Sequence, residues 1–228
     1  MPTWNDFFGN FDWTGLLTFA FTAVAALFCI TIHELAHGFA AFLLGDSTAK
    51  KAGRLTLNPF KHLDVLGLLM LVSVHVGWAK PVPINPNRFK RPKLGMAVTA
   101  MAGPLSNFLV SFAALCVGRL FYFSYADHAW GAYVVLGLLY LAVLSVGLGL
   151  FNLIPIPPLD GSKILLSSLP QSLSMKIMRV ERYIALAMLA LVWLGLFSAP
   201  LDFAREWTME KMCLLSGFPF ELVELFFF

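Results

Sequence analysis

Residues 33–37 of the chain read HELAH, which places two imidazoles and a carboxylate within five residues. On a helix, His33 and His37 stand four residues apart and project from one face. This is the HExxH pattern, in which both histidines bind zinc and the glutamate, here Glu34, acts as a general base. The alternative is a pair of core histidines that only make hydrogen bonds. Ionisable residues are costly within an apolar helix and usually functional there, which favours metal binding.

A catalytic zinc site requires a third protein ligand and an open position for water. The patterns of soluble zinc proteases do not supply this ligand, because Ala40 and Leu43 stand where metzincins have glycine and histidine. The residues that remain as candidates for the third ligand are His62, Asp64, His75 and Asp160.

Asp160 stands out because of the sequence around it, which reads GLFNLIPIPPLDGSKILL over residues 149–166. The three prolines of this stretch should end the preceding helix, since proline lacks an N–H group and clashes with the turn before it. Gly161 permits a tight backbone beside the carboxylate. The spacing alone leaves three interpretations open: Asp160 is the third ligand, Asp160 is the N-cap of the next helix, or His75 is the ligand instead.

The composition of the chain is that of a membrane protein. Of its 228 residues, 59% are hydrophobic and 13% are charged, and the mean hydropathy is +0.77, whereas soluble domains carry about 25% charged residues. Four stretches are long and apolar enough to span about 30 Å of hydrocarbon. These predicted spans cover residues 14–44, 94–124, 130–152 and 183–200.

A shorter apolar stretch over residues 65–77 ends in VSVHV, an alternation that is typical of a strand. Since lipid-exposed strand edges are not tolerated, we expect a shielded, re-entrant β-like element over residues 65–85. Such an element could pair with an unwound substrate by strand addition. The prolines at 81 and 83 would limit it to edge pairing.

Basic residues mark the side of the membrane on which each loop lies. Three loops hold 13 of the 16 lysines and arginines, and the positive-inside rule places these loops in the cytoplasm. This requires the segment 65–77 to enter the membrane and return, with both termini outside. The residues are Lys50, Lys51, Arg54 and Lys61; Lys80, Arg88, Lys90, Arg91 and Lys93; and Lys163, Lys176, Arg179 and Arg182.

These observations predict an all-α polytopic membrane protein with about four transmembrane helices and one re-entrant β-like element. We expect a single membrane-embedded domain over residues 1–228, with a core at about 14–170. His33 lies in the second half of its predicted span, the half nearer to the first basic loop. The metal site should therefore lie within the bilayer, wetted from the cytoplasmic side.

Three motifs together resemble those of the site-2 protease family of intramembrane zinc metalloproteases. They are HELAH (33–37), AGPLSN (102–107) and NLIPIPPLDG (152–161), and GWAKPVPINP (77–86) is similar to the family's re-entrant loop. The resemblance covers about residues 20–170 and implies that His33, His37 and Asp160 bind zinc while Glu34 activates water. Family members often carry PDZ or CBS domains, which we do not expect here, and they cleave membrane-spanning regulators such as anti-sigma factors.

Two asparagines are candidates for supporting the reaction. The developing oxyanion requires a donor besides zinc, and Asn152 is our candidate because it lies at the end of a span, just before the prolines. The resemblance also points to Asn107 as a catalytic residue. For each, the alternative is an interhelical hydrogen bond that only supports packing. Gly103 and Pro104 are interpreted as structural.

The sequence therefore predicts an endopeptidase with one Zn²⁺ per chain. Its expected partners are a membrane protein with a single transmembrane segment, as substrate, and the lipid bilayer, with no nucleic acid. The expected location is the plasma membrane of a bacterium or archaeon. The alternatives are a metal transporter or sensor with the same ligands, which the absence of internal repeats disfavours, and a non-catalytic scaffold.

Overall fold

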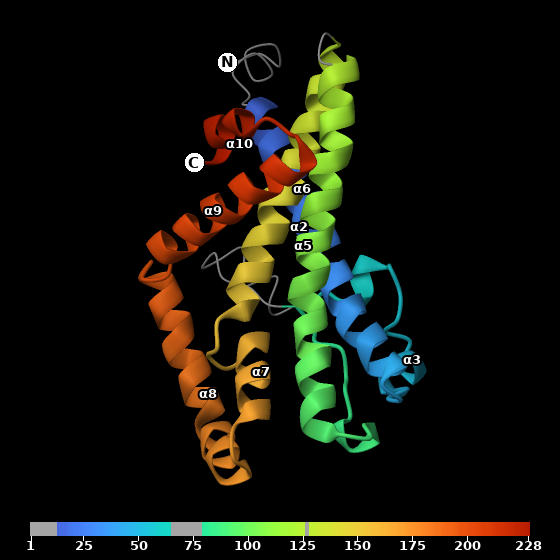
Figure 1. Cartoon of the computed structure of the whole chain (residues 1–228), viewed down its shortest axis with the longest axis vertical. Helices are drawn as coiled ribbons and strands as arrows, with labels where there is room; N and C mark the ends of the chain where they lie inside the picture. Colours follow the sequence, from blue (N-terminus) through green and yellow to red (C-terminus); the bar gives the residue numbers. More distant parts are fainter. Residues whose placement is uncertain (1–12, 65–78, 126–127) are drawn as a thin grey trace, which may run out of the picture.

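Three long helices form the centre of the molecule in the computed structural model, which describes residues 13–64, 79–125 and 128–228. They are α2 (Trp13–Leu43), α5 (Pro92–Tyr125) and α6 (Ala129–Leu153). Helix α5 runs along most of the molecule and packs against both α2 and α6 (Figure 1). All three are rich in apolar residues on every side, as expected of helices surrounded by lipid and protein. By length and composition each could cross a membrane, which confirms three of the predicted spans.

The fourth predicted span, over residues 183–200, is wrong as a single uninterrupted helix. The structure has α8 (Gln171–Trp193) and α9 (Ser198–Ser216), with a bend of 79° between them. Gly195 lies in this break with φ +72°, a left-handed conformation that glycine adopts at little cost. The bent pair adds a fourth membrane crossing only if its two helices are counted as one broken span.

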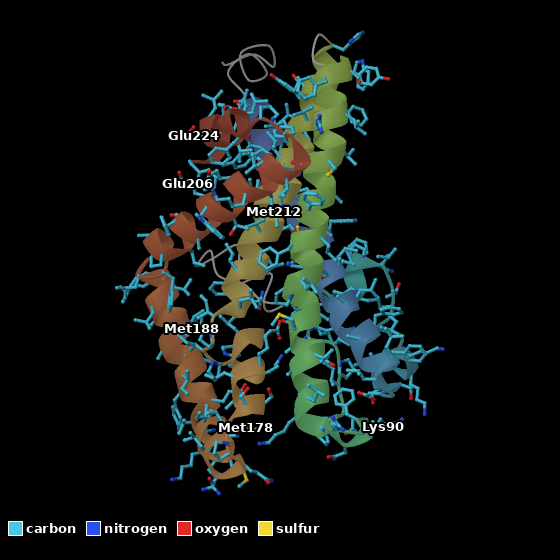
Figure 2. The ribbon with its side chains drawn as sticks, viewed as in Figure 1. Lys90, Met178, Met188, Glu206, Met212 and Glu224 are labelled. Atoms are coloured by element: carbon cyan, nitrogen blue, oxygen red, sulfur yellow. The ribbon has the colours of Figure 1, made fainter. Side chains whose placement is uncertain are left out.

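Shorter helices complete the described part of the chain and mark the two ends of the molecule. Lys90 and Met178 lie at one end, and Glu206 and Glu224 lie toward the other (Figure 2). The basic end, which carries Lys90 of the second basic loop, is thus separated in space from the end that carries Glu206 and Glu224. The remaining elements are α3 (Thr48–Lys51), η1 (Pro59–Lys61), η2 (Pro86–Arg88), α7 (Asp160–Ser168) and α10 (Phe220–Phe227).

Helices α9 and α10 fold back onto α5 and α6 and close the hydrophobic core at their end of the molecule (Figure 1). Leu115 of α5, Val146 of α6, Met209 of α9 and Val223 of α10 are all fully buried in this cluster. Burial of each such side chain stabilises the fold by about 1.5–3 kcal/mol. The core therefore holds α5 and α6 together independently of the candidate metal ligands.

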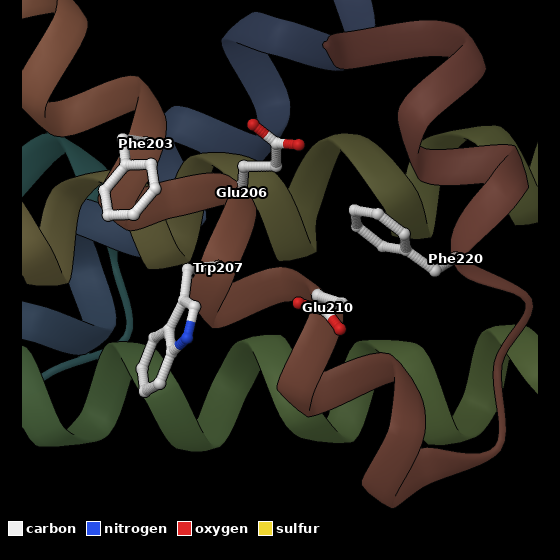
Figure 3. A pocket seen from close by; sticks show the side chains of 5 residues that line it. All are labelled: Phe203, Glu206, Trp207, Glu210 and Phe220. Carbon is white, nitrogen blue, oxygen red and sulfur yellow. The ribbon is translucent and has the colours of Figure 1, made fainter.

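A hollow of about 320 Å³ lies between α9 and α10 (Figure 3). Glu206 and Glu210 line it together with three aromatic residues, Phe203, Trp207 and Phe220. Phe203 and Trp207 are 72% and 57% exposed, so the hollow is open rather than enclosed. None of its lining residues is one of the predicted site residues.

The predicted β-like element is not supported by the structure. Its first part, including the VSVHV alternation and His75, lies outside the described residues. In the part that is described, 79–85 is an extended segment, and its pairing is a single bridge between Leu63 and Ala79. Strand addition through a β-like element thus has no support from the described residues.

The physical reason lies in the N–H groups of the segment 79–85. The residues at 81 and 83 are prolines and have no N–H group to donate. The N–H of Val82 donates to Glu34 Oε2 at 2.9 Å, and the N–H of Asn85 donates to Asp46 Oδ2 at 2.6 Å. Side chains of α2 and the turn after it therefore bind groups that a sheet would require.

Asp46 joins the turn after α2 to this extended segment. Its side chain is fully buried, and its Oδ1 accepts hydrogen bonds from both the N–H and the hydroxyl of Thr48. Burial by itself would raise the pKa of the Asp46 carboxyl, but the hydrogen bonds from Asn85 and Thr48 and the charge of Arg88 lower this pKa below its usual value. The carboxylate form is therefore the form that stabilises the turn.

We expect Asp46→Asn to lower the free energy of unfolding by about 2 kcal/mol, because an amide cannot accept on both sides as the carboxylate does. Unfolding in mixed detergent micelles measures this. The native pKa lies below the unfolded value, so the contribution is fully present above about pH 4 and is lost as the pH falls through the native pKa. The matched control is Asp202→Asn, which removes an exposed pair with Arg205 and should change stability little. Equal effects of the two substitutions would contradict the proposed role of Asp46.

Candidate metal centre

The structure brings His33 and His37 of α2 together with Asp160, the first residue of α7. Oδ2 of Asp160 lies 3.1 Å from Nε2 of His33 and 2.9 Å from Nε2 of His37. All three residues are buried, and one potential ligand atom from each lies within 4.8 Å of the others. Two residues from one helix thus meet a third from more than a hundred residues later in the chain.

These three residues fit a zinc ion. A tetrahedral zinc with bonds of 2.0–2.2 Å separates its ligand atoms by about 3.3–3.6 Å. The separations of 3.1 and 2.9 Å between Asp160 Oδ2 and the two Nε2 atoms are somewhat shorter, so the side chains need to move apart only slightly to hold the ion. Two imidazoles and one carboxylate are a donor set that catalytic zinc sites use, with the fourth position left for water.

The chain between α6 and α7 explains how Asp160 reaches the histidines. Helix α6 ends at Leu153, before the prolines, as predicted. Leu159 occupies the N-cap position of α7, so the interpretation of Asp160 as an N-cap is wrong. At Gly161 a Cβ atom would lie 2.6 Å from the carbonyl oxygen of Ile154, so that only glycine lets α7 pack this closely against the end of α6.

Helix α5 contacts both imidazoles and orients them. Nδ1 of His37 lies 2.7 Å from the carbonyl oxygen of Thr99, to which its N–H donates. Nδ1 of His33 lies 3.3 Å from Nδ2 of Asn107. Between these two positions, a Cβ atom at Gly103 would collide with both rings and lie 2.7 Å from Cε1 of His33. The interpretation of Gly103 as structural thus acquires a specific reason.

Glu34 and Lys163 add charge around the three candidate ligands. The partly buried Glu34 carboxylate accepts a hydrogen bond from the Val82 N–H, which fixes one of its oxygens. Nζ of Lys163 lies 2.8 Å from Oδ1 of Asp160, the oxygen that does not face the histidines. This leaves Oδ2 of Asp160 as the oxygen directed at a metal.

The other sequence-predicted residues lie differently. Asn107 is fully buried beside His33, whereas Nδ2 of Asn152 donates to the carbonyl of Leu148 in its own helix at 3.0 Å. His62 is buried, with Nε2 at 2.9 Å from the carbonyl oxygen of Thr56. His75 lies outside the described residues.

Two contacts of the site were missed by sequence reasoning. Lys163 follows Asp160 by three residues on a helix, a spacing that brings side chains together, so its pairing could have been expected. The contribution of Val82 is a backbone N–H group, which every residue except proline carries. No residue-type signal could have revealed it.

Known proteins are similar to the chain over most of its length. The model of peptidase family M50 matches residues 122–195, a range that includes Asn152 and Asp160. Over 203 residues the chain is 36% identical to "Putative zinc metalloprotease YwhC" of Bacillus subtilis, which covers 83% of this chain and 85% of that protein. The chain belongs to peptidase family M50. This is the site-2 protease family, so the resemblance of the sequence motifs is confirmed.

Two further relatives carry the same description under the name Rip2. The protein of Mycolicibacterium smegmatis is 30% identical over 141 residues, and that of Mycobacterium tuberculosis is 29% identical over 139 residues. Each match covers 59% of this chain and 52% of the relative. No solved structure matches the chain.

The family and the apolar helices together establish a zinc-dependent protease of the site-2 type in a membrane. This replaces the alternatives of a metal transporter or sensor and of a non-catalytic scaffold. The structure supplies three residues that could hold the zinc.

We expect Gly103→Ala to weaken zinc binding at least 10-fold, because the added methyl group would push α5 away from both imidazoles. Zinc bound to the purified chain, measured by competition with a chelator, tests this. The matched control is Gly147→Ala on α6, where the nearest side-chain atom to the new Cβ is 3.9 Å away. Unchanged zinc binding in Gly103→Ala would contradict the close packing described above.

Proposed function

We propose that the chain cleaves peptide bonds in or near the transmembrane segments of membrane proteins, at one zinc ion held by His33, His37 and Asp160. The observation that carries the proposal is the position of Asp160 Oδ2 within about 3 Å of both Nε2 atoms. All three residues are buried, and the histidines lie on a helix long enough to cross a membrane. A protease whose metal ligands lie on such a helix would cleave peptide bonds that lie within the membrane.

Zinc, when bound, supplies a Lewis acid that polarises the scissile carbonyl and makes water more acidic. Glu34 is the proposed general base: its carboxylate takes the proton from water and delivers it to the leaving amine. Its hydrogen bond from the Val82 N–H supports this role, because it fixes the orientation of the carboxylate. A carboxylate held in one orientation transfers protons without first having to be ordered.

The developing negative charge on the substrate requires a further hydrogen-bond donor. Asn152 is the proposed donor, at the end of α6 and eight residues before Asp160 in the chain. Its Nδ2 carries two hydrogens: one is donated to the Leu148 carbonyl, and the second can be donated to the substrate. Asn107, the other predicted catalytic residue, contacts His33 and acts on the reaction through that ligand.

We propose that the protein lies in the plasma membrane of a bacterium or archaeon, with the site accessible from the cytoplasm. Lys90 marks the basic end of the molecule, which the positive-inside rule places in the cytoplasm (Figure 2). The buried Asp160 pairs with Lys163, whose side chain is 42% exposed. Water can follow this pair toward the metal ligands.

The proposed substrate is a membrane protein with a single transmembrane segment. A helix hides its peptide bonds within its own hydrogen bonds, so the substrate must unwind locally before it is cut. The bilayer is the second partner, and nucleic acid has no role in this mechanism.

We expect Glu34→Gln to retain zinc and to lose at least 100-fold in cleavage rate, because the amide accepts from Val82 but cannot take a proton. The assay measures bound zinc and cleavage of a panel of single-span membrane proteins reconstituted with the purified chain. The matched control is Glu206→Gln on the exposed face of α9, which should cleave like the wild type. Cleavage that persists in Glu34→Gln would show that another group is the base.

We expect a labelling experiment in intact cells to find the two ends of the molecule on opposite sides of the membrane. In a background without the native cysteines, Glu224→Cys should react with a membrane-impermeant maleimide added outside. Lys50→Cys should react only after the membrane is opened, because Lys50 lies in the first basic loop. The reverse pattern would contradict the proposed orientation.

A further inference from the structure

The side chain of Asn107 is fully buried, and one of its two polar atoms has no partner. Nδ2 lies 3.3 Å from Nδ1 of His33, while Oδ1 makes no hydrogen bond within the part of the chain that the structure describes. A buried polar atom without a partner costs about 1–3 kcal/mol. A side chain that keeps such an atom beside a metal ligand requires an explanation.

The proton on the His33 ring supplies the explanation. A neutral imidazole carries one N–H, so if Nδ1 accepts from Asn107, the proton lies on Nε2 and points at Asp160 Oδ2, 3.1 Å away. A histidine that binds zinc through Nε2 has its proton on Nδ1 and almost always donates it to an acceptor. In that state Nδ2 of Asn107 would face a second donor, which is repulsive.

We propose that Asn107 is a positioning residue for zinc-bound His33 and accepts the Nδ1–H through its Oδ1, after a half-turn of its amide. The inference rests on the proposed zinc site. The two ends of a carboxamide have nearly the same shape, so the half-turn requires little space. It gives Oδ1 the partner that it lacks, while Nδ2 takes the position that Oδ1 occupies in the structure.

The backbone around Asn107 is held while its amide turns. The hydroxyl of Ser145 on α6 donates to the Asn107 carbonyl oxygen at 2.9 Å, and both residues are fully buried. His37 requires no such residue, because the Thr99 carbonyl beside its Nδ1 can only accept. The two candidate ligands thus differ in their partners. His37 is held by the Thr99 carbonyl, which can only accept, whereas His33 is held by the Asn107 amide, which can present either its oxygen or its nitrogen.

Two substitutions of Asn107 test whether its side chain acts on His33 as a hydrogen-bond acceptor or as a donor. Asn107→Asp keeps the size of the side chain and can only accept, whereas Asn107→Leu has similar volume and makes no hydrogen bond. We expect the aspartate variant to bind zinc as tightly as the wild type or more tightly, and the leucine variant 10- to 100-fold more weakly. The matched control is Ser106→Ala, one residue away on α5, which removes a bond to the Gly103 carbonyl and should leave zinc affinity unchanged.

The experiment uses the full chain purified in detergent and measures zinc affinity by competition with a chromophoric chelator. Equal weakening in both variants would overturn the proposal, because the amide would then act as a donor or by packing alone. Wild-type affinity in Asn107→Leu would overturn it as well. If the leucine variant does not fold, the aspartate variant decides: affinity at or above the wild-type value supports the proposal, and lower affinity overturns it. A wild-type chain that binds no zinc would instead overturn the zinc site itself, so the two failures can be told apart.

Discussion

The contact of one Asp160 oxygen with two imidazoles is the constraint on which the candidate metal centre depends. A buried carboxylate is stable only when it is paired and hydrogen-bonded. Here the pairing involves two helices: α2 presents both histidines on one face, and α7 supplies Asp160 and also Lys163, which contacts the second carboxylate oxygen. Both α2 and α7 pack against α5 and α6, and α5 and α6 are themselves held by a core at the α9–α10 end that does not include the ligands.

Helix α5 acts as a template for the imidazoles. Gly103 lets its backbone approach the rings, Thr99 fixes the proton of one ring, and Asn107 lies at the other. A side chain at 103 would prevent the approach, and a different register of α5 would remove both hydrogen bonds. The residues of AGPLSN on α5 thus form a surface that contacts the HELAH residues of α2. Glu34 is held by a different part of the chain, the extended segment 79–85.

The three longest helices and the two histidines could be predicted from the sequence because apolar length and an i, i+4 spacing are local properties. The partner of the histidines was not predictable in this way. Asp160 is separated from His33 by 127 residues, and spacing along the chain does not reveal such a contact. The broken helix at Gly195 was missed because its flanks are apolar on both sides, and apolar composition hides a change of direction. The predicted β-like element was extended to residue 85 from an alternation that lies before residue 79. In the segment 79–85, the prolines and the side chains of Glu34 and Asp46 leave few free N–H groups.

The distance of 127 residues between His33 and Asp160 also has a consequence for how the protein is made. A ribosome synthesises α2 first, so the two histidines enter the membrane long before their carboxylate partner exists. During this interval Glu34 of the same helix is the carboxylate nearest to the imidazoles in the chain, and α5 is synthesised before α7. In the proposed zinc site, the third ligand is therefore added only when α7 emerges, and an unfinished chain lacks it.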